Sequence, residues 1–408
     1  MAVGAPSHFP LEPVAGVRLG TARAGIRKPG RRDLVVLELA PGTRAAGSFT
    51  RNAFCAAPVT VAKEHLAAVA GEPRLLLVNT GNANAGTGEQ GMRAAQESCA
   101  ALAQLAGVPA QAVLPFSTGV IGEQLPVERL VAGLPDALAA LDENGWDIAA
   151  EGIMTTDTRP KGASRRIVLD GVPVTLSGIA KGAGMIKPDM ATMLCFVATD
   201  ARIAQPLLEA ALARAVDASF NAITVDGDTS TNDACILAAT GMAAHVELLD
   251  PADPRLAVFE EALGALFIEL AQAVIRDAEG ATKFVAVEVS GGLSREECRR
   301  VAYAVAESPL VKTALFASDP NWGRILMAVG RAGVADLDVS RVEVSISGVR
   351  IASRGARDPA YTEEAGQRVM SAEDITISVA LGRGDVAATV WTSDLSHDYV
   401  RINAEYRS

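Results

Sequence analysis

The sequence predicts an α+β fold, in which helices and strands are partly segregated along the chain. Nearly half of the 408 residues are hydrophobic, so the chain can bury a large core. Short apolar runs typical of strands gather at the start, the middle and the end, while longer amphipathic runs lie between them. Because the two kinds of segment do not alternate strictly, the pattern favours α+β over a doubly wound parallel sheet.

The expected strands are short apolar or alternating runs bounded by turn residues. They lie at 33–39, 75–78, 193–199, 283–290, 341–346, 375–381 and 386–392. A further alternating stretch, 165–176, contains Asp170-Gly171 at its centre, and this dipeptide predicts a β-hairpin.

The expected helices show hydrophobic residues at helical spacing. They lie at 92–105, 127–134, 206–216 and 258–278. Pro135 is predicted to start a separate helix that reaches about residue 141, since proline favours the first helical turn. Ser294 and Glu297 form a capping box, which predicts a helix through about residue 305.

Composition and charge narrow the functional classes. The net charge of -11 argues against a nucleic-acid partner, and the densest basic patch, RKPGRR at 27–32, is short. Five cysteines without a CxxC pair favour reduced thiols. The N-terminus does not resemble a signal peptide, and the apolar segment 262–275 is interrupted by Glu269. These features predict a cytoplasmic protein with no membrane partner.

The segment 181–201 combines an irregular half with a buried strand. Its first half is rich in glycine and contains Pro188, and Ala191-Thr192 stands just before the apolar run. If Thr192 Oγ attacked the carbonyl of Ala191 and the ester were hydrolysed, Thr192 would become a new N-terminus. Its free α-amine could then accept the hydroxyl proton. Spacing alone leaves open that Thr192 is simply a β-favouring residue that enters a sheet.

The segment KGAGMIKPDMATMLCF at 181–196 resembles the self-cleavage segment of the ornithine acetyltransferase family, also called glutamate N-acetyltransferases of arginine biosynthesis. Further blocks resemble the same family in the same order, so the resemblance covers nearly the whole chain. They are GIRKPGRRDL (25–34), NTGNANAGTGEQG (79–91), STGVIGEQLP (117–126), TTDT (155–158), TVDGDTSTNDA (224–234), SDPNWGRIL (318–326) and TSDLSHDYVRINAEY (392–406).

The resemblance implies a layered helix/sheet/sheet/helix fold of the N-terminal-nucleophile type. It also implies autocatalytic cleavage between Ala191 and Thr192, which gives an α chain of residues 1–191 and a β chain of residues 192–408. Two chains of each kind are expected to form a heterotetramer.

The resemblance also assigns the site. Thr192 is implied as the nucleophile, and Thr118 with Gly119 as the oxyanion hole, although Ser117-Thr118-Gly119 alone is typical of an ordinary turn. Thr155 is preferred over Thr156 as an upstream hydroxyl contact. The implied substrate-binding residues are Thr155, Lys181, Thr192, Glu279, Asn403 and Ser408, with Lys181 on a substrate carboxylate and Glu279 on an amino group.

The implied reaction transfers acetyl from N2-acetyl-L-ornithine to L-glutamate through an acetyl-Thr192 ester, without a cofactor. Three alternatives remain open. They are a bifunctional enzyme that also uses acetyl-CoA as a co-substrate, an aminopeptidase or amidase on the same scaffold, and a non-catalytic protein that binds a nucleotide at the loop 86–91.

Other motifs are incomplete. The glycines at 86, 88 and 91 imitate a dinucleotide fingerprint without its acidic partner, and Asp226-x-Asp228 lacks the glycine and glutamate of a calcium loop. The four histidines are far apart in sequence, so no metal site is expected. Cys195 is predicted to lie in the core.

Overall fold

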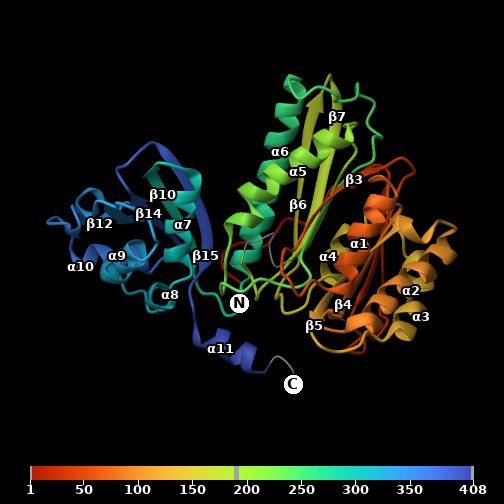
Figure 1. Cartoon of the computed structure of the whole chain (residues 1–408), viewed down its shortest axis with the longest axis horizontal. Helices are drawn as coiled ribbons and strands as arrows, with labels where there is room; N and C mark the ends of the chain where they lie inside the picture. The colour runs from red at the N-terminus through yellow and green to blue at the C-terminus, as the bar shows by residue number, and fades with distance from the viewer. Residues whose placement is uncertain (1, 188–192, 406–408) are drawn as a thin grey trace.

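Three β-sheets and the helices that cover them make up the described part of the chain (Figure 1). The structure is a computed structural model that describes residues 2–187 and 193–405. Ala191, Thr192 and Ser408 therefore lie outside the described residues. The strand orders are β1-β2-β4-β5, β3-β9-β8-β7-β6 and β13-β12-β11-β14-β10-β15.

Three helices cover one face of the four-stranded sheet. Its strands are β1 (Val17–Ala22), β2 (Leu34–Leu39), β4 (Leu75–Asn82) and β5 (Val113–Val120), and its helices are α1 (Ala57–Ala68), α2 (Gly88–Ala106) and α3 (Val127–Ala139). One core joins this face to the helices, and a second core lies on the other face. Strands β4 and β5 run parallel, so their carboxyl ends meet at one edge.

The five-stranded sheet packs against that second face. Its strands are β3 (Arg44–Phe49), β6 (Lys161–Leu169), β7 (Val172–Lys181), β8 (Leu194–Thr199) and β9 (Ala234–Ala239). Phe196 of β8 meets Phe116 of β5 edge to face across the two sheets, with ring centroids 5.0 Å apart. Strand β8 lies between β7 and β9, so this sheet joins strands that precede residue 188 to strands that follow residue 192.

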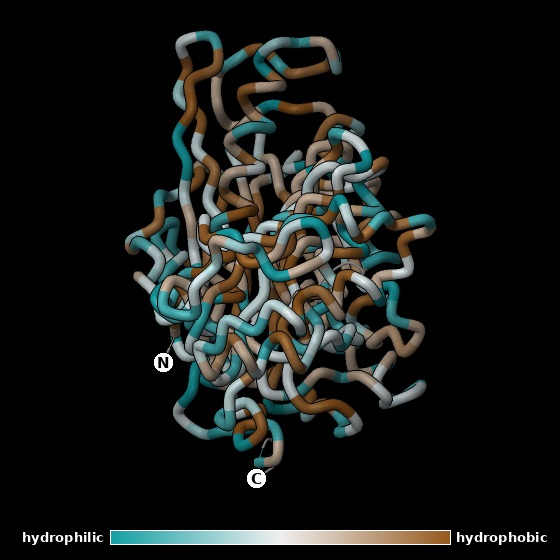
Figure 2. The backbone as a smooth tube through the Cα atoms, turned by 90° about the vertical axis from the view of Figure 1, so that its left-hand side faces the viewer, coloured by the Kyte–Doolittle hydropathy of each residue, from teal (hydrophilic) through white to brown (hydrophobic). Residues whose placement is uncertain are grey.

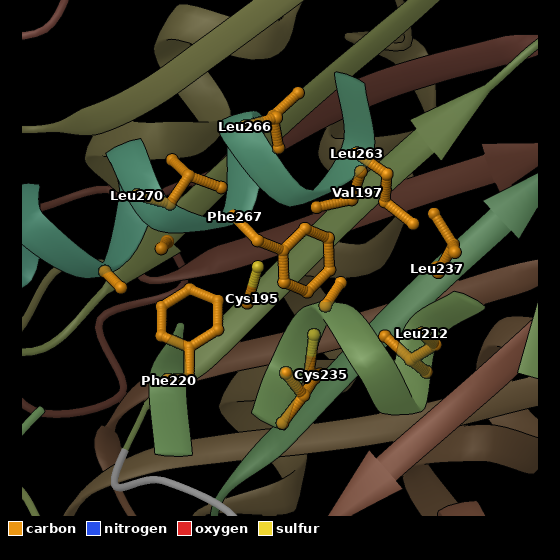
Figure 3. Packing of buried hydrophobic residues seen from close by; sticks show 14 of the residues in the cluster. Cys195, Val197, Leu212, Phe220, Cys235, Leu237, Leu263, Leu266, Phe267 and Leu270 are labelled. Carbon is orange, nitrogen blue, oxygen red and sulfur yellow. The ribbon is translucent and has the colours of Figure 1, made fainter. Parts of the chain in front are cut away.

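Two helices, α5 (Gln205–Ala218) and α6 (Pro254–Arg276), cover the outer face of the five-stranded sheet. Figure 3 shows Cys195 and Val197 of β8 facing Phe267 of α6. The alternate residues Leu194 and Phe196 face the four-stranded sheet instead. Both faces of β8 are therefore apolar, and all six of its residues are buried. The predicted helix/sheet/sheet/helix layering is confirmed.

A third sheet with its own core forms the C-terminal lobe, which lies to the left in Figure 1. Its strands are β10 (Phe284–Gly292), β11 (Glu343–Ile346), β12 (Val349–Ser353), β13 (Ala356–Arg357), β14 (Asp374–Ala380) and β15 (Val386–Ser393). Its helices are α7 (Arg295–Ala306), α8 (Pro309–Phe316), α9 (Trp322–Gly330) and α10 (Glu363–Met370). After β15 the chain returns toward the first two sheets as α11 (His397–Ala404), and α4 (Trp146–Gly152) lies beside β1 and β7.

Most expected elements are confirmed, with boundaries shifted by a few residues. Asp170 and Gly171 both have positive φ, at 52° and 75°, as the hairpin between β6 and β7 requires. Ser294 Oγ accepts from the Glu297 amide and caps α7. Figure 2 shows the hydrophobic segments gathered inside the molecule, with hydrophilic segments on many outer loops.

Two expectations are wrong. Pro135 does not begin a new helix but lies inside the continuous helix α3. Buried Leu130, Leu134 and Ala137 hold both halves of α3 against the sheet, which outweighs the hydrogen bond that proline lacks. Strand β4 does not end at residue 78 but continues to Asn82, because it pairs with β5 over that stretch. In the described ranges, no helix has both the length and the apolar character needed to cross a membrane.

Candidate active site

A cavity of about 250 Å³, here called the central cavity, opens where both sandwich sheets meet the C-terminal helix α11. It brings together six of the residues that the sequence assigns to the site: Thr118, Gly119, Thr155, Lys181, Glu279 and Asn403. Thr156, the alternative to Thr155, also lines it. The other assigned residues, Ala191, Thr192 and Ser408, lie outside the described residues.

Thr118 and Gly119 stand near the carboxyl end of β5, paired in register with Thr80 and Gly81 of β4. The two strands approach each other so closely that a Cβ on Gly119 would lie 2.3 Å from the carbonyl carbon of Gly81. The φ of Gly119 is +135°, which also excludes most other residues. The sequence alone indicated an ordinary turn here, but the hydroxyl and the glycine stand on a rigid strand.

Lys181 is the last residue of β7, and its side chain is buried. Its Nζ donates to Thr118 Oγ1 over 3.0 Å. Burial lowers the pKa of Lys181 below the usual value for a lysine, while the nearby carboxylates of Asp157 and Asp233 raise it in part. The site therefore holds a poorly solvated ammonium group, which is well suited to bind a carboxylate.

A buried charge cluster supports the loop that follows Lys181. Lys161 Nζ donates to Asp157 and Asp277, at 2.6 Å each, and Asp157 also accepts from the amide of Gly182 over 2.8 Å. Burial raises the pKa of Asp157, but the charges of Lys161 and Lys181 outweigh burial and hold it below its ordinary value. Sequence reasoning missed this cluster. Its signal was the acidic residue of the TTDT block at 155–158.

Glu279 and Asn403 also line the central cavity. Asn403 Nδ2 donates to Glu279 Oε2 over 2.8 Å, so helix α11 orients the carboxylate. The amide of Glu279 donates to the carbonyl of Ala183, and a Cβ on Gly184 would lie 2.3 Å from Glu279 Oε2. The glycines of the segment 181–184 thus allow Glu279 to approach the loop.

The chain is anchored on both sides of positions 188–192. Before them, Asp226 accepts from the amides of Met185 and Ile186, at 2.7 and 2.9 Å, and from Tyr399 Oη of α11. After them, the carbonyl of Met193 accepts from the amide of Ala234. The TVDGDTSTNDA block therefore holds the chain near the site and has no need of calcium to do so.

The start of β8 lies beside the cavity. Leu194 pairs in register with Lys181, so the chain enters β8 next to the buried ammonium. Asn232 lines the cavity and donates to the carbonyls of Ala83 and Ser117, over 2.6 and 3.0 Å. Asp233 is buried, and burial raises its pKa, which Lys181 opposes. The family resemblance covers this loop in the block at 224–234, but sequence reasoning assigned neither residue to the site.

The groups in the central cavity suit acyl transfer. A hydroxyl and a glycine amide stand next to each other, and a buried ammonium and a fixed carboxylate line the same cavity. The predicted nucleophile, Thr192, stands two positions before the start of β8 in the sequence. Among residues 2–187 and 193–405, no group of His, Cys, Asp or Glu is placed to hold a metal ion. Cys195 lies in the core as predicted, where burial and the neighbouring Cys235 raise its pKa.

Comparisons with known proteins give one consistent answer. The sequence model of the ArgJ family matches residues 18–408. The chain is 58% identical over 408 residues, all of both chains, to the "Arginine biosynthesis bifunctional protein ArgJ" of Pseudomonas syringae pv. tomato. It is also 58% identical over 402 residues, 98% of both chains, to the protein of the same name from Methylococcus capsulatus.

A solved structure is similar as well. The crystal structure of the arginine biosynthesis bifunctional protein argJ from Bacillus halodurans matches with a TM-score of 0.50 and 40% sequence identity. The match covers 53% of this chain and 100% of that chain.

Proposed function

Since the chain belongs to the ArgJ family, we propose that it transfers the acetyl group of N2-acetyl-L-ornithine to L-glutamate. The resemblance of its sequence blocks to the acetyltransferases of arginine biosynthesis is confirmed. The observation that carries the proposal is the central cavity, where six residues from distant parts of the sequence converge beside the strand that follows Thr192.

Thr192 is proposed as the nucleophile, released by cleavage after Ala191. The new α-amine accepts the proton of its own hydroxyl, and Oγ attacks the acetyl carbonyl. The proposed cut divides the chain into pieces of 191 and 217 residues.

The oxyanion of the tetrahedral intermediate is proposed to accept hydrogen bonds from Thr118 Oγ1 and the amide of Gly119. Lys181 Nζ already donates to Thr118 Oγ1, so the hydroxyl hydrogen of Thr118 is directed to another acceptor. A donor held on a strand needs little reorganisation during the reaction, which is what makes an oxyanion hole effective.

Substrate recognition is proposed to use the two opposite charges of the cavity. Lys181 binds the α-carboxylate that N2-acetylornithine and glutamate share, and Glu279, oriented by Asn403, binds the δ-ammonium of ornithine. Thr155 contributes a hydroxyl contact, and Ser408 is proposed as a contact from the chain terminus.

The assembly and the second activity are also part of the proposal. Two chains of residues 1–191 and two of 192–408 form a heterotetramer in the cytoplasm, and no resident cofactor is needed. The curated relatives are called bifunctional. This supports the alternative in which acetyl-CoA also donates acetyl to glutamate. An aminopeptidase or amidase would instead release acetate without an acceptor.

Intact-mass analysis of purified protein, with and without N2-acetylornithine, tests the mechanism. We expect two fragments of 191 and 217 residues, and one added acetyl group on the fragment that begins at Thr192. Thr192→Ala should stay a single chain without an adduct, whereas Thr192→Ser should still be cut. An uncut wild-type protein with full activity would contradict the proposal.

A further inference from the structure

A second cavity, here called the basic cavity, adjoins the central cavity. Its volume is about 300 Å³, and it shares Gly119, Val120, Thr155 and Thr156 with the central cavity. Its remaining wall includes the loop 27–31, Thr80 and Gly81 of β4, and the end of α11. Gly119, a proposed oxyanion donor, therefore lies on the boundary between the two cavities.

Three cationic side chains from one short loop line the basic cavity: Arg27, Lys28 and Arg31. Arg31 donates to the carbonyls of Met154 and Thr155 and forms no ion pair with any described residue. Lys28 is exposed and makes no hydrogen bond or ion pair within the described ranges. Of the three, only Arg27 has a carboxylate partner in the described part of the chain, namely Glu123 at 2.9 Å on the surface. These charges stand out in a chain with a net charge of -11.

The basic loop is held in place from inside. Asp33 accepts from the amides of Ala24 and Ile26, at 2.7 and 2.6 Å, so its negative charge is bound to the backbone just before the basic residues. Glu405 brings one more carboxylate to the opposite wall. The cations therefore remain in excess among the residues that line the basic cavity.

Thr80 forms part of the wall that the basic cavity shares with the end of β4. Its side chain is 98% buried, and its hydroxyl has no hydrogen-bond partner among the described residues. Thr80 pairs in register with Thr118 and lines the basic cavity, so it belongs to the wall that continues into the oxyanion hole.

We propose that the basic cavity binds the phosphorylated pantetheine carrier of an acetyl thioester, acetyl-CoA, and presents the thioester carbonyl at Gly119. This inference rests on the proposed acetyl transfer and gives its second donor a site. The phosphates lie against Lys28, Arg27 and Arg31, and the acetyl end enters the central cavity through the shared wall. The central cavity itself has the size of an amino acid and carries Glu279, which repels phosphates.

The transfer step balances without another reactant. Thr192 Oγ forms a bond to the acetyl carbon while the bond from that carbon to sulfur breaks. The hydroxyl proton passes through the α-amine to the departing thiolate, and free CoA leaves. The amine of glutamate then attacks the same ester as after acetylation by N2-acetylornithine.

The test compares two donors in Lys28→Gln and in Arg27→Gln, with Arg18→Gln as matched control. Arg18 forms a surface ion pair with Glu38 and lines neither cavity. Loss of one contact to a phosphate should lower kcat/KM for acetyl-CoA about ten-fold. The kcat/KM for N2-acetylornithine should change much less. S-acetylpantetheine has no phosphate, so its kcat/KM should be the same in wild type and variant.

Three other results would contradict the inference or the proposed function. If the KM for glutamate rises in the variants with either donor, the cations bind the acceptor's side-chain carboxylate and the inference is overturned. If wild type uses N2-acetylornithine but never acetyl-CoA, the inference fails while the proposed function stands. If neither donor yields N-acetylglutamate, the proposed function itself is wrong.

Discussion

Lys181 Nζ donates a hydrogen bond to Thr118 Oγ1 over 3.0 Å, and 63 positions of sequence separate the two residues. The bond connects the carboxyl end of β7 in one sheet to that of β5 in the other. It gives the hydroxyl a fixed acceptor role toward the lysine, so its hydrogen is available for a ligand. One contact therefore joins the proposed carboxylate-binding group to the proposed oxyanion donor.

Thr118→Val should keep the shape of the site and remove the hydroxyl. We expect kcat to fall about 100-fold, the usual effect of losing one oxyanion donor, with a smaller change in KM. Steady-state rates with N2-acetylornithine and glutamate measure this. Thr118→Ser restores the donor and should recover most of kcat. Equal rates in Thr118→Val and wild type would exclude Thr118 from the oxyanion hole.

The pH dependence of KM should report Lys181. Burial lowers the pKa of this lysine, and only the charged form binds a carboxylate, so binding weakens as pH rises through that lowered value. The KM for N2-acetylornithine should therefore rise at a pH below the ordinary lysine value of 10.5. Lys181→Arg, which stays charged, should lose this rise. An unchanged pH profile in Lys181→Arg would assign the titration to another group.

Asp157→Asn should destabilise the protein strongly. The substitution leaves Lys161 buried with one carboxylate instead of two, and breaking a buried ion pair costs about 3–5 kcal/mol. Denaturant unfolding measures the loss. Glu89→Gln, which breaks an exposed pair with Arg93, should change the free energy of unfolding by less than about 0.5 kcal/mol.

The stability of Asp157→Asn should also depend on pH differently from that of wild type. The pKa of Asp157 is lower in the folded chain than its ordinary value of 3.8, so its ionisation stabilises the fold above that pH. This stabilisation disappears as pH falls through the lower, folded-state value. The free energy of unfolding of Asp157→Asn should consequently fall less steeply in acid than that of wild type. Parallel curves would show that folding does not lower the pKa of Asp157.

Glu279→Gln should affect the KM for N2-acetylornithine but not the KM for glutamate. Loss of the carboxylate removes the partner of the δ-ammonium, so the KM for N2-acetylornithine should rise about ten-fold. Glutamate has no ammonium at that position, and its KM should not rise. Gly184→Ala gives an independent check, because its Cβ would lie 2.3 Å from Glu279 Oε2 and displace the carboxylate. A rise in the KM for glutamate alone would reverse the assignment.

The sequence predicted correctly those strands, turns and helix ends that a few neighbouring residues determine. The apolar run of β8, the Asp170-Gly171 turn and the cap of α7 are of this kind. The continuous helix through Pro135 was missed because packing on the sheet decides it. The short strands β12 and β13 depend on pairing with β11 and with each other, and lack a local signal.

The sequence also predicted some residues of the candidate site and missed others. The sequence blocks and their family resemblance assigned Thr118, Lys181, Glu279 and Asn403, and the fold brings them to one cavity. The contact between Lys161 and Asp277 spans 116 positions, so no spacing rule could reveal it. The basic loop was noticed only as a charged patch. Its position beside Gly119 follows from the pairing of β2 with β4 and of β4 with β5.

The five-stranded sheet contains strands from both proposed products of cleavage. β3, β6 and β7 belong to the upstream piece, while β8 and β9, which belong to the downstream piece, lie between them. Neither piece can complete this sheet alone, so a nicked molecule stays assembled until it is denatured. Renaturation would then be a reaction between two molecules, and its rate would increase with protein concentration. The uncut precursor would refold at a rate independent of dilution.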